Sequence, residues 1–245
     1  MKYIGVDLAW TYNNETGICV IDHIGRVEFL ESKIFTDEEI VEMIQLESKY
    51  ELMIGIDAPL IVNNEGGSRD AERSLLKSRI NGYRVYAFNS NRTFLEKTFK
   101  SIRGETVSHL LVDQIPNTSI GQKNFHTIQE TFPTGICAGL FPNIYPVNYK
   151  RKKGMTFSES LDRMETLINE IKKFEVRSMI SGFSEVYQYD RKDMSVKHYK
   201  HLEDKMDAFL CALAMYLIDN NYAYEHNFGS LGEGCIIIPE LKIQL

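Results

Sequence analysis

The sequence predicts an α/β protein whose centre is a mixed β-sheet flanked by helices. Three short apolar runs in the first 35 residues, joined by polar turns, are typical of an antiparallel meander. A helix start and a buried strand that ends at Asp57 follow the meander, which gives the order β-β-β-α-β. This order is the opening of a ribonuclease-H-like fold, an architectural analogy that carries no function by itself.

The first four elements have clear local signals. Thr36 is a typical helix N-cap, and Glu39 stands three residues later, where a capping box requires an acid or amide. Residues 52–56 form a short apolar run before Asp57-Ala58-Pro59, as expected of a buried strand. The meander strands are expected at residues 2–8, 17–22 and 26–35.

Residues 61–125 are expected to be a large insertion after the fourth strand. A helix is expected at 68–77, and the rest of the segment is polar, aromatic and only weakly periodic. The sequence has no repeat, no low-complexity tract and no clean linker, and a length of 245 residues suits one large domain. We therefore expect a single domain over residues 1–245, with the insertion at about 61–125.

The second half of the chain alternates apolar and basic segments. Apolar residues at helical spacing predict one amphipathic helix, and a longer apolar run predicts a buried one. Pro133 and Pro239 should each end a strand, the second of them at the edge of the sheet. We expect strands at 127–132 and 232–239, helices at 157–174 and 199–220, a basic loop at 134–154 and a poorly defined short segment at 176–180.

Charge gives a local signal rather than a global one. The net charge of −6 does not indicate nucleic-acid binding. Residues 61–125 nevertheless hold ten Lys/Arg against six Asp/Glu, and residues 150–153 are all basic. Such patches could bind a polyanion, or they could be solvated loop charges.

Other classes of protein lack support. No apolar stretch is long enough to cross a bilayer, and Asp7 interrupts the region where a signal peptide needs an apolar core, so a cytoplasmic protein with no membrane partner is expected. The cysteines at 19, 137, 211 and 235 form no CxxC pair, which argues against a zinc site or a disulfide framework. Glycine motifs for a P-loop or a Rossmann site are missing, as is a nucleophile elbow.

Four aspartates mark the candidate site. Asp7 and Asp57 end two inner strands, and Asp204 and Asp207 share one face at the start of the last helix. Clustered carboxylates repel strongly unless a cation neutralises them. We therefore expect these four residues to hold Mg²⁺ or Mn²⁺ for two-metal hydrolysis. Taken singly, each has a plainer explanation, as a strand-ending turn or as a first-turn acid favoured by the helix dipole.

Several other residues are weaker candidates. Glu130 ends a strand and could be a fifth catalytic acid, or it could be an exposed strand residue. Arg69 and Arg73 could clamp a phosphate or form an ordinary helix face. His201 could move a proton or simply lie on the surface. Aromatic residues that could stack bases, or merely pack, are Trp10, Tyr12, Tyr83, Tyr86 and Phe88.

The order of these motifs resembles the domain-of-unknown-function family 429 (DUF429), described as predicted nucleases of ribonuclease-H fold. The resemblance runs from residue 3 to residue 239. Its motifs are Gly5-Val-Asp-Leu-Ala-Trp10, Gly55-Ile-Asp-Ala-Pro-Leu60, Arg69-Asp70 with Arg73, Glu130-Thr-Phe-Pro133, Tyr149-Lys150 with Gly154, His201 with Asp204-x-x-Asp207-Ala, and Gly234-Cys-Ile-Ile-Ile-Pro239.

The ending Asp204-x-x-Asp207-Ala is also similar to that of Holliday-junction resolvases, whose helix acids bind metals together with an acid on strand one and another on an inner strand. This resemblance implies metal binding by Asp7, Asp57, Asp204 and Asp207. The resolvases have a glutamate at the inner strand end, where this chain has the shorter Asp57, so one metal position could be shifted or weakened.

The leading hypothesis is a metal-dependent nuclease that acts on DNA or RNA. Arg69, Arg73, Lys150, Lys152 and His201 would bind the substrate. One alternative is an ATP- or phosphate-binding protein of the actin and sugar-kinase-like superfamily, although the turn after Asp7 is polar rather than glycine-rich. The other alternative is a non-catalytic binding module. The sequence does not indicate the oligomeric state.

Overall fold

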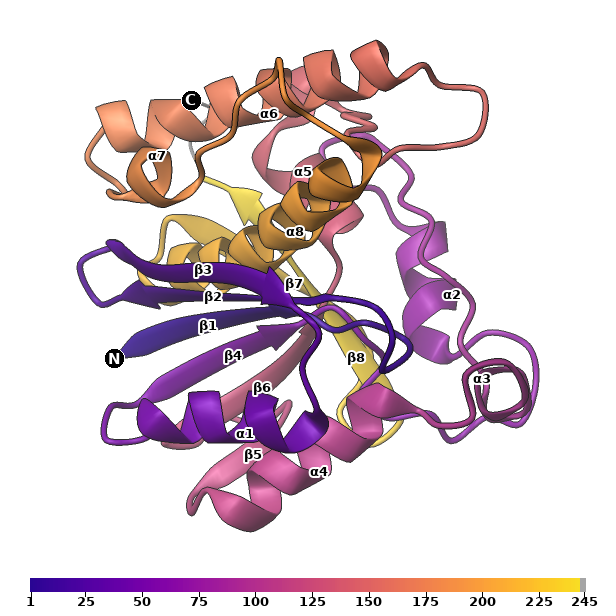
Figure 1. Cartoon of the computed structure of the whole chain (residues 1–245). Coiled ribbons are helices and arrows are strands. Elements are labelled where there is room, and N and C mark those ends of the chain that lie inside the picture. The colour runs from indigo at the N-terminus through magenta and orange to yellow at the C-terminus, as the bar shows by residue number, and fades with distance from the viewer. Residues whose placement is uncertain (243–245) are drawn as a thin grey trace.

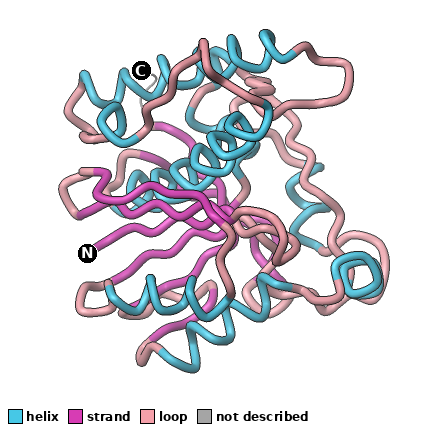
Figure 2. Tube along the Cα trace, viewed as in Figure 1, coloured by secondary structure: helices cyan, strands magenta, loops and turns pink. Residues whose placement is uncertain are grey.

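The computed structural model describes residues 1–242, and its centre is a mixed β-sheet with helices on both faces (Figure 1). The eight-stranded sheet has the order β3-β2-β1-β4-β6-β8-β7, and β5 pairs with β6 off this path. Figure 2 shows the strands in magenta, with helices in cyan on both sides of them. This arrangement confirms the predicted fold class, compatible with a ribonuclease-H-like fold. The strands are β1 (Lys2–Asp7), β2 (Thr16–Asp22), β3 (Val27–Lys33), β4 (Leu52–Ile56), β5 (Thr118–Ile120), β6 (His126–Thr131), β7 (Ala223–Ser230) and β8 (Gly234–Leu241).

Helices form a layer on each face of the sheet. In Figure 1, α5, α6, α7 and α8 lie above the sheet, and α1 and α4 lie below it. The helices are α1 (Asp37–Leu46), α2 (Asp70–Lys77), α3 (Arg92–Phe99), α4 (Arg103–Gln114), α5 (Pro133–Leu140), α6 (Phe157–Val176), α7 (Phe183–Val186) and α8 (Val196–Asp219), with a short 3₁₀ turn at Pro142–Ile144.

The predicted meander and the strand after it are present. β1 pairs antiparallel with β2, which pairs antiparallel with β3, and β1 pairs parallel with β4. The helix between them starts as the sequence predicts: the backbone N–H of Glu39 donates to Thr36 Oγ1 at 3.2 Å, and Glu39 Oε2 accepts from the N–H of Thr36 at 2.8 Å. β1 and β4 therefore become inner strands, with their carboxyl ends side by side.

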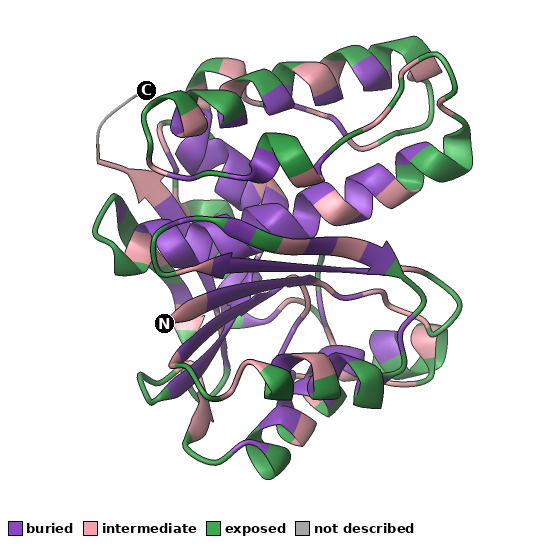
Figure 3. Ribbon diagram, turned by 60° about the vertical axis from the view of Figure 1, so that its left-hand side comes forward, coloured by how far each residue is buried: buried purple, intermediate pink, exposed green. Residues whose placement is uncertain are grey.

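Strand alternation divides the core into two parts. Tyr3 and Met53 face α8, whereas Ile4 and Ile54 face α1 and α4. The inner strands β1, β4 and β6 and most of α8 are buried, while the outer surface of α6 is exposed (Figure 3). None of the described helices is both long enough and apolar enough to cross a membrane.

The segment from 61 to 125 is more ordered than its weak periodicity predicts. The expected helix is present as α2, but α3, α4 and β5 were not predicted. Val107 and Leu111 of α4 belong to the same buried cluster as Ile54 of β4, so α4 is part of the main helix layer. In Figure 1, α2 and α3 instead lie beyond the carboxyl ends of β1 and β4.

The prediction of a loop from residue 134 onward is wrong for α5. Its two glycines lower helix propensity, but they are required by packing. A Cβ at Gly139 would lie 1.7 Å from the Pro239 carbonyl oxygen, and one at Gly135 would lie 2.1 Å from Ile238 Cδ1. Close contact with β8 therefore outweighs propensity in this helix.

The end of the sheet also differs from the prediction. β8 is not an edge strand, because it lies between β6 and β7, and it continues through Pro239 to Leu241. β6 pairs with β8 only at Ile236 and Ile237, so Pro239 lies where the strand has no sheet partner on that side. The outer strand β7 was missed because most of its residues are exposed and weakly apolar.

Glycines under α8 let this helix lie directly on the sheet. A Cβ at Gly5 of β1 would lie 2.0 Å from the Ala208 carbonyl oxygen and 2.3 Å from the Ala212 nitrogen. One at Gly17 of β2 would lie 2.1 Å from the Asp204 carbonyl oxygen. The same close approach brings the start of α8 down to the carboxyl end of β1.

Replacing Gly5 with alanine should therefore destabilise the protein by about 2–3 kcal/mol, because the helix backbone must move away from the sheet. Urea unfolding measures the change. Gly66→Ala is the matched control, since a Cβ there meets nothing within 4 Å. Equal stability of the two variants would contradict this account of how α8 is seated.

Candidate functional site

The carboxyl ends of β1 and β4 place two aspartates next to each other. Asp7 is the last residue of β1, and Asp57 follows β4 directly, with its backbone N–H donating to the Val6 carbonyl at 2.8 Å. By strand alternation Asp7 lies on the same face as Gly5, and Asp57 on the same face as Gly55. That face is covered by α8, so both carboxylates point toward the helix side of the sheet.

Helix α8 supplies Asp207 to the same place. The residue is 1% exposed. One carboxylate oxygen from each of Asp7, Asp57 and Asp207 lies within 4.8 Å of the other two. We call Asp7, Asp57 and Asp207 the acidic trio. The carboxylates come from three segments far apart in the sequence, and the sheet and the seating of α8 bring them together.

The trio is electrostatically strained. Burial raises the pKa of Asp7 well above its usual value, and the negative charge of Asp207 raises it further. Burial raises the pKa of Asp57 to about 7, with Asp207 and Glu130 adding to the effect and Lys150 opposing it. Carboxylates with raised pKa values gathered at one point are typical of functional sites.

Two side chains from the loop after α5 hold Asp207. Tyr149 donates its hydroxyl hydrogen to Asp207 Oδ1, and Lys150 forms an ion pair with Asp207 Oδ2. Burial opposes the charge on Lys150, but attraction to Asp207, Asp57 and Asp7 outweighs it and raises the pKa of the ammonium. Lys150 is therefore the internal cation of the trio.

Asp204 lies one turn before Asp207 and has its own partner. It is 3% exposed and forms an ion pair with Lys200. Burial raises the pKa of Asp204, while Lys200 and a hydrogen bond with Asp7 oppose the rise. The structure thus brings Asp204 to the margin of the trio.

Glu130 lies close enough to raise the pKa of Asp57, but its hydrogen-bond partners lie outside the trio. In the parallel register it lies opposite Ile56, whose side chain packs on the α1 and α4 face, so strand alternation turns Glu130 from α8. Its oxygens accept from Arg69 Nη2 at 2.5 Å, from Arg69 Nη1 at 2.9 Å and from the Leu60 N–H at 3.1 Å. Glu130 is a buried partner of Arg69 in this structure.

Arg69 is fully occupied by protein groups. Besides Glu130 it contacts Glu72 Oε1 through Nε at 2.8 Å and through Nη2 at 2.7 Å, and it donates to the Ile61 carbonyl at 2.9 Å. The residue is 4% exposed. Its position does not suit the phosphate clamp considered from the sequence, and it joins the start of α2 to the end of β6.

Replacing Arg69 with methionine should destabilise the protein by about 3 kcal/mol, because Glu130 and Glu72 would remain buried without a cation. Urea unfolding measures the loss. Arg73→Met is the matched control, since Arg73 lies on the same helix with its side chain 53% exposed. Similar stability of the two variants would show that the buried pair is not structural.

The contacts of the remaining sequence candidates are with groups outside the trio. Arg73 contacts Asp70 and the Ser68 carbonyl at the surface. Lys152 donates to Asn148 Oδ1 at 3.1 Å. His201 lies against two acids of the β2 and β3 side, with Nδ1 2.7 Å from Glu15 Oε2 and Nε2 3.3 Å from Glu31 Oε1.

A basic groove opens next to the trio. It has a volume of about 630 Å³ and runs between the loop after α5 and the start of α8. Glu203 lies in it, with Oε1 accepting from the backbone N–H of Arg151 at 2.5 Å. The cations that line the groove are Lys150, Arg151, Lys152, Lys153 and Lys200.

Comparison with known proteins identifies the family. A family model described as "Protein of unknown function (DUF429)" matches residues 5–226. The chain belongs to this family. No curated protein and no solved structure matches it. The motif resemblance seen in the sequence is thus confirmed at the level of the DUF429 family.

Sequence reasoning missed three polar residues of this DUF429 site, namely Tyr149, Lys200 and Glu203. A signal for Tyr149 existed, because it immediately precedes Lys150 in a motif shared with the family. Lys200 could have been found from helical spacing, since it stands four residues before Asp204. Glu203 gave no separate signal, because its partner is a backbone N–H in a loop of unpredicted shape.

The donor set of the trio suits a divalent cation. Carboxylate oxygens are the ligands that Mg²⁺ and Mn²⁺ prefer. When all three carboxyl groups are ionised they outnumber the ammonium group of Lys150, so a divalent ion would favour the ionised forms of Asp7 and Asp57 that burial and repulsion disfavour. Asp7, Asp57 and Asp207 are the residues that would hold an ion, and Asp57, despite its short side chain, reaches the other two.

Proposed function

We propose that this protein is a divalent-metal-dependent phosphodiesterase that hydrolyses nucleic acid, DNA or RNA. The observation that carries the proposal is the acidic trio, with carboxylate oxygens of Asp7, Asp57 and Asp207 within 4.8 Å of one another. A fully ionised cluster of this kind is unfavourable without a cation, which supports a role in holding Mg²⁺ or Mn²⁺.

The protein's part in the reaction is to fix the carboxylates. β1 and β4 are inner strands paired with each other, so Asp7 and Asp57 have little freedom to separate. Asp207 is held by Tyr149 and Lys150 on a buried helix. When bound, a divalent ion supplies an activated water at neutral pH and stabilises charge on the phosphate during hydrolysis.

The basic groove supports a polyanionic substrate. Its cations lie on one side of the trio and could neutralise consecutive phosphates of a strand whose scissile phosphate is at the acids. Binding through such contacts weakens steeply with salt, whereas a small phosphate ester would show a shallower dependence. The net charge of −6 makes this groove a local exception on an acidic protein.

The test combines metal binding and cleavage. Wild-type protein is titrated with Mn²⁺ by calorimetry and incubated with end-labelled single-stranded DNA, single-stranded RNA and duplex DNA, in Mn²⁺ or EDTA. We expect Mn²⁺ binding, and cleavage that EDTA abolishes. Asp7→Asn should lose both, and Asp113→Asn, an exposed acid on α4, should keep both.

Two results would overturn the proposal. One is a flat Mn²⁺ titration with the wild-type protein. The other is cleavage by Asp7→Asn at the wild-type rate, which would trace the activity to a contaminant or to another site. Thermal stabilisation by ATP–Mg²⁺ without any effect of nucleic acid would favour the actin and sugar-kinase-like alternative instead.

A further inference from the structure

A cavity beside the acidic trio has an aromatic wall that hydrolysis of a phosphate does not need. The cavity measures about 240 Å³ and is lined by Asp57 and Lys150 on the side of the site. Trp10 stacks on Phe99 with 4.9 Å between ring centroids, and Phe88 packs against Trp10 at 5.4 Å. Phe88 is 50% exposed, so the wall is accessible rather than closed into the core.

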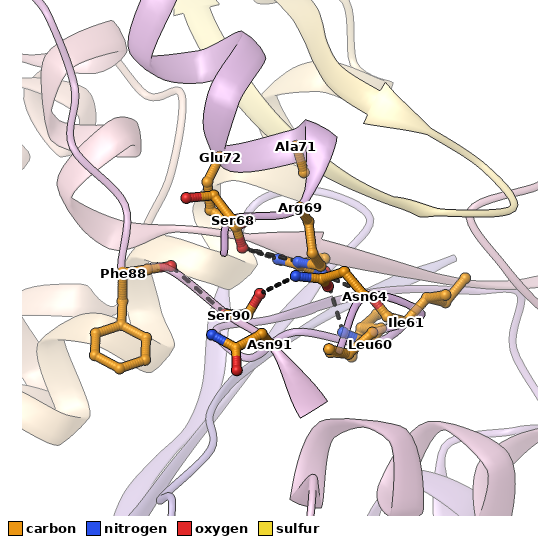
Figure 4. Close-up of polar contacts among 12 residues, drawn as sticks. Leu60, Ile61, Asn64, Ser68, Arg69, Ala71, Glu72, Phe88, Ser90 and Asn91 are labelled. Carbon is orange, nitrogen blue, oxygen red and sulfur yellow. Dashed lines mark hydrogen bonds and ion pairs between the residues drawn. The ribbon is translucent and has the colours of Figure 1, made fainter. Parts of the chain in front are cut away.

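Glu72 carries a carboxylate oxygen that no described protein group uses. The residue is 3% exposed and lines the cavity. Its Oε1 accepts from Arg69, whereas its Oε2 is buried without a hydrogen-bond partner among residues 1–242. Figure 4 shows Glu72 and Arg69 beside the segment that carries Phe88 and Ser90. Buried polar atoms are normally paired, so this oxygen indicates a missing donor.

We infer that this cavity binds an unpaired nucleobase that carries an amino group, next to the phosphate held at the trio. The inference rests on the proposed function and names its substrate more closely. A planar base stacks on aromatic side chains, and its amino N–H can donate to Glu72 Oε2. Uracil and thymine have no amino group, and carbonyl oxygens flank their one ring N–H, so a carboxylate disfavours them.

The size and position of the cavity agree with a single base. A volume of about 240 Å³ lies below the roughly 300–1,000 Å³ of pockets for drug-sized ligands. Lys150 lines both this cavity and the basic groove. A strand can therefore lay its backbone in the groove and one base in the cavity. A base can enter only when it is unpaired, so the substrate is single-stranded or locally opened.

The chain provides its own probe, because Trp10 is its one tryptophan. Adenosine, cytidine and uridine are titrated against the full-length protein in EDTA, and the quenching of tryptophan fluorescence is followed. We expect saturable quenching by adenosine and cytidine, and binding of uridine at least fivefold weaker. Phe88→Ala should weaken adenosine binding about tenfold, as expected for the loss of one stacking partner.

Two further variants make the test specific. Phe125→Ala is the matched control, since Phe125 is 48% exposed and immediately precedes β6, at the opposite end of that strand from Glu130, which lines the cavity. It should bind as wild type does. Glu72→Gln should bring adenosine and uridine within about twofold of each other, because the amide can donate as well as accept.

The outcomes separate this inference from the proposed function. No saturable quenching, equal binding of uridine and adenosine, or unchanged binding by Phe88→Ala would overturn the base cavity even if the protein cleaves nucleic acid. Quenching with the expected preference would support the cavity even if no cleavage is found. The Phe88 variant keeps the test decisive should Glu72→Gln fail to fold.

Discussion

Replacing Asp57 with asparagine is expected to abolish metal-dependent cleavage and, at the same time, to stabilise the metal-free protein at alkaline pH. Cleavage should fall at least about 1,000-fold, because a metal contributes several kcal/mol to hydrolysis and the trio would lose a charged ligand. Burial and the nearby acids raise the pKa of Asp57 to about 7, so its charged form is disfavoured in the folded protein. Replacing it with a neutral residue should therefore raise stability at alkaline pH.

The pH dependence follows from the direction of that shift. An unfolded aspartate has a pKa of about 4, so between pH 4 and pH 7 the folded protein binds a proton at Asp57 that the unfolded chain has lost. The contribution of this carboxyl to stability is therefore full below pH 4, declines as the pH rises, and is lost above pH 7.

The stabilisation by Asp57→Asn should consequently be seen at pH 8 and vanish near pH 4. A rise in pKa from about 4 to about 7 corresponds to about 4 kcal/mol, which the partial exposure of Asp57 reduces to about 2 kcal/mol. Urea unfolding in EDTA at the two pH values measures it, with Asp113→Asn as the control. A variant that is less stable than wild type at pH 8 would show that the trio is not strained.

The elements that could be predicted from the sequence are those with strong local signals. The capping box of Thr36 and Glu39, the apolar strand of residues 52–56 and the long helix that holds Asp207 all lie within a few residues of their expected bounds. Their signals are local, because capping, periodicity and runs of apolar residues need no knowledge of the partner segments.

The elements that were missed depend on contacts distant in sequence. Helix α5 contains Gly135 and Gly139, which are required only because β8 packs too close for a larger side chain. β7 is mostly exposed, and its strand character comes from antiparallel pairing with β8 over its whole length. Local propensity is a weak guide in such segments, since tertiary contacts decide the outcome.

The candidate site shows the same division. Asp7 and Asp57 could be expected to approach each other because parallel inner strands end at one edge of a sheet. The burial of Glu130 could also have been deduced, since it shares the strand phase of Ile128, a core residue. The pairing of Glu130 with Arg69 could not have been deduced, because Arg69 lies in the segment 61–125, whose path the sequence does not define.

Lys150 is the residue whose position sequence reasoning could least anticipate. It is the first of four consecutive basic residues, a pattern typical of a solvated loop. Its ammonium group nevertheless pairs with Asp207. Asp7 and Asp57 also attract that group. A lysine at this place has two opposite effects, because it neutralises the trio in the metal-free protein and occupies a carboxylate that a divalent ion would use.

Replacing Lys150 with methionine should therefore change stability and metal affinity in opposite directions. In EDTA the variant should lose about 1–2 kcal/mol, since Asp207 would lose its cation, although the partial exposure of Lys150 reduces the effect below that of a fully buried pair. Its affinity for Mn²⁺ should rise by up to about 100-fold, because the ion no longer competes with the ammonium group and 1.4 kcal/mol corresponds to about tenfold. At saturating Mn²⁺ its stability should approach that of wild type.

Thermal unfolding and calorimetry with Mn²⁺ measure these effects, and Lys152→Met is the matched control. Lys152 belongs to the same loop but donates to Asn148, not to an acid of the trio, so its loss should leave Mn²⁺ binding unchanged. If Lys150 only held substrate phosphate, its replacement would raise the KM for nucleic acid and leave Mn²⁺ affinity as it is. If the Lys150 ammonium group competes with Mn²⁺ for Asp207, its removal must both tighten Mn²⁺ binding and lower stability in EDTA. Only the two changes together support this competition.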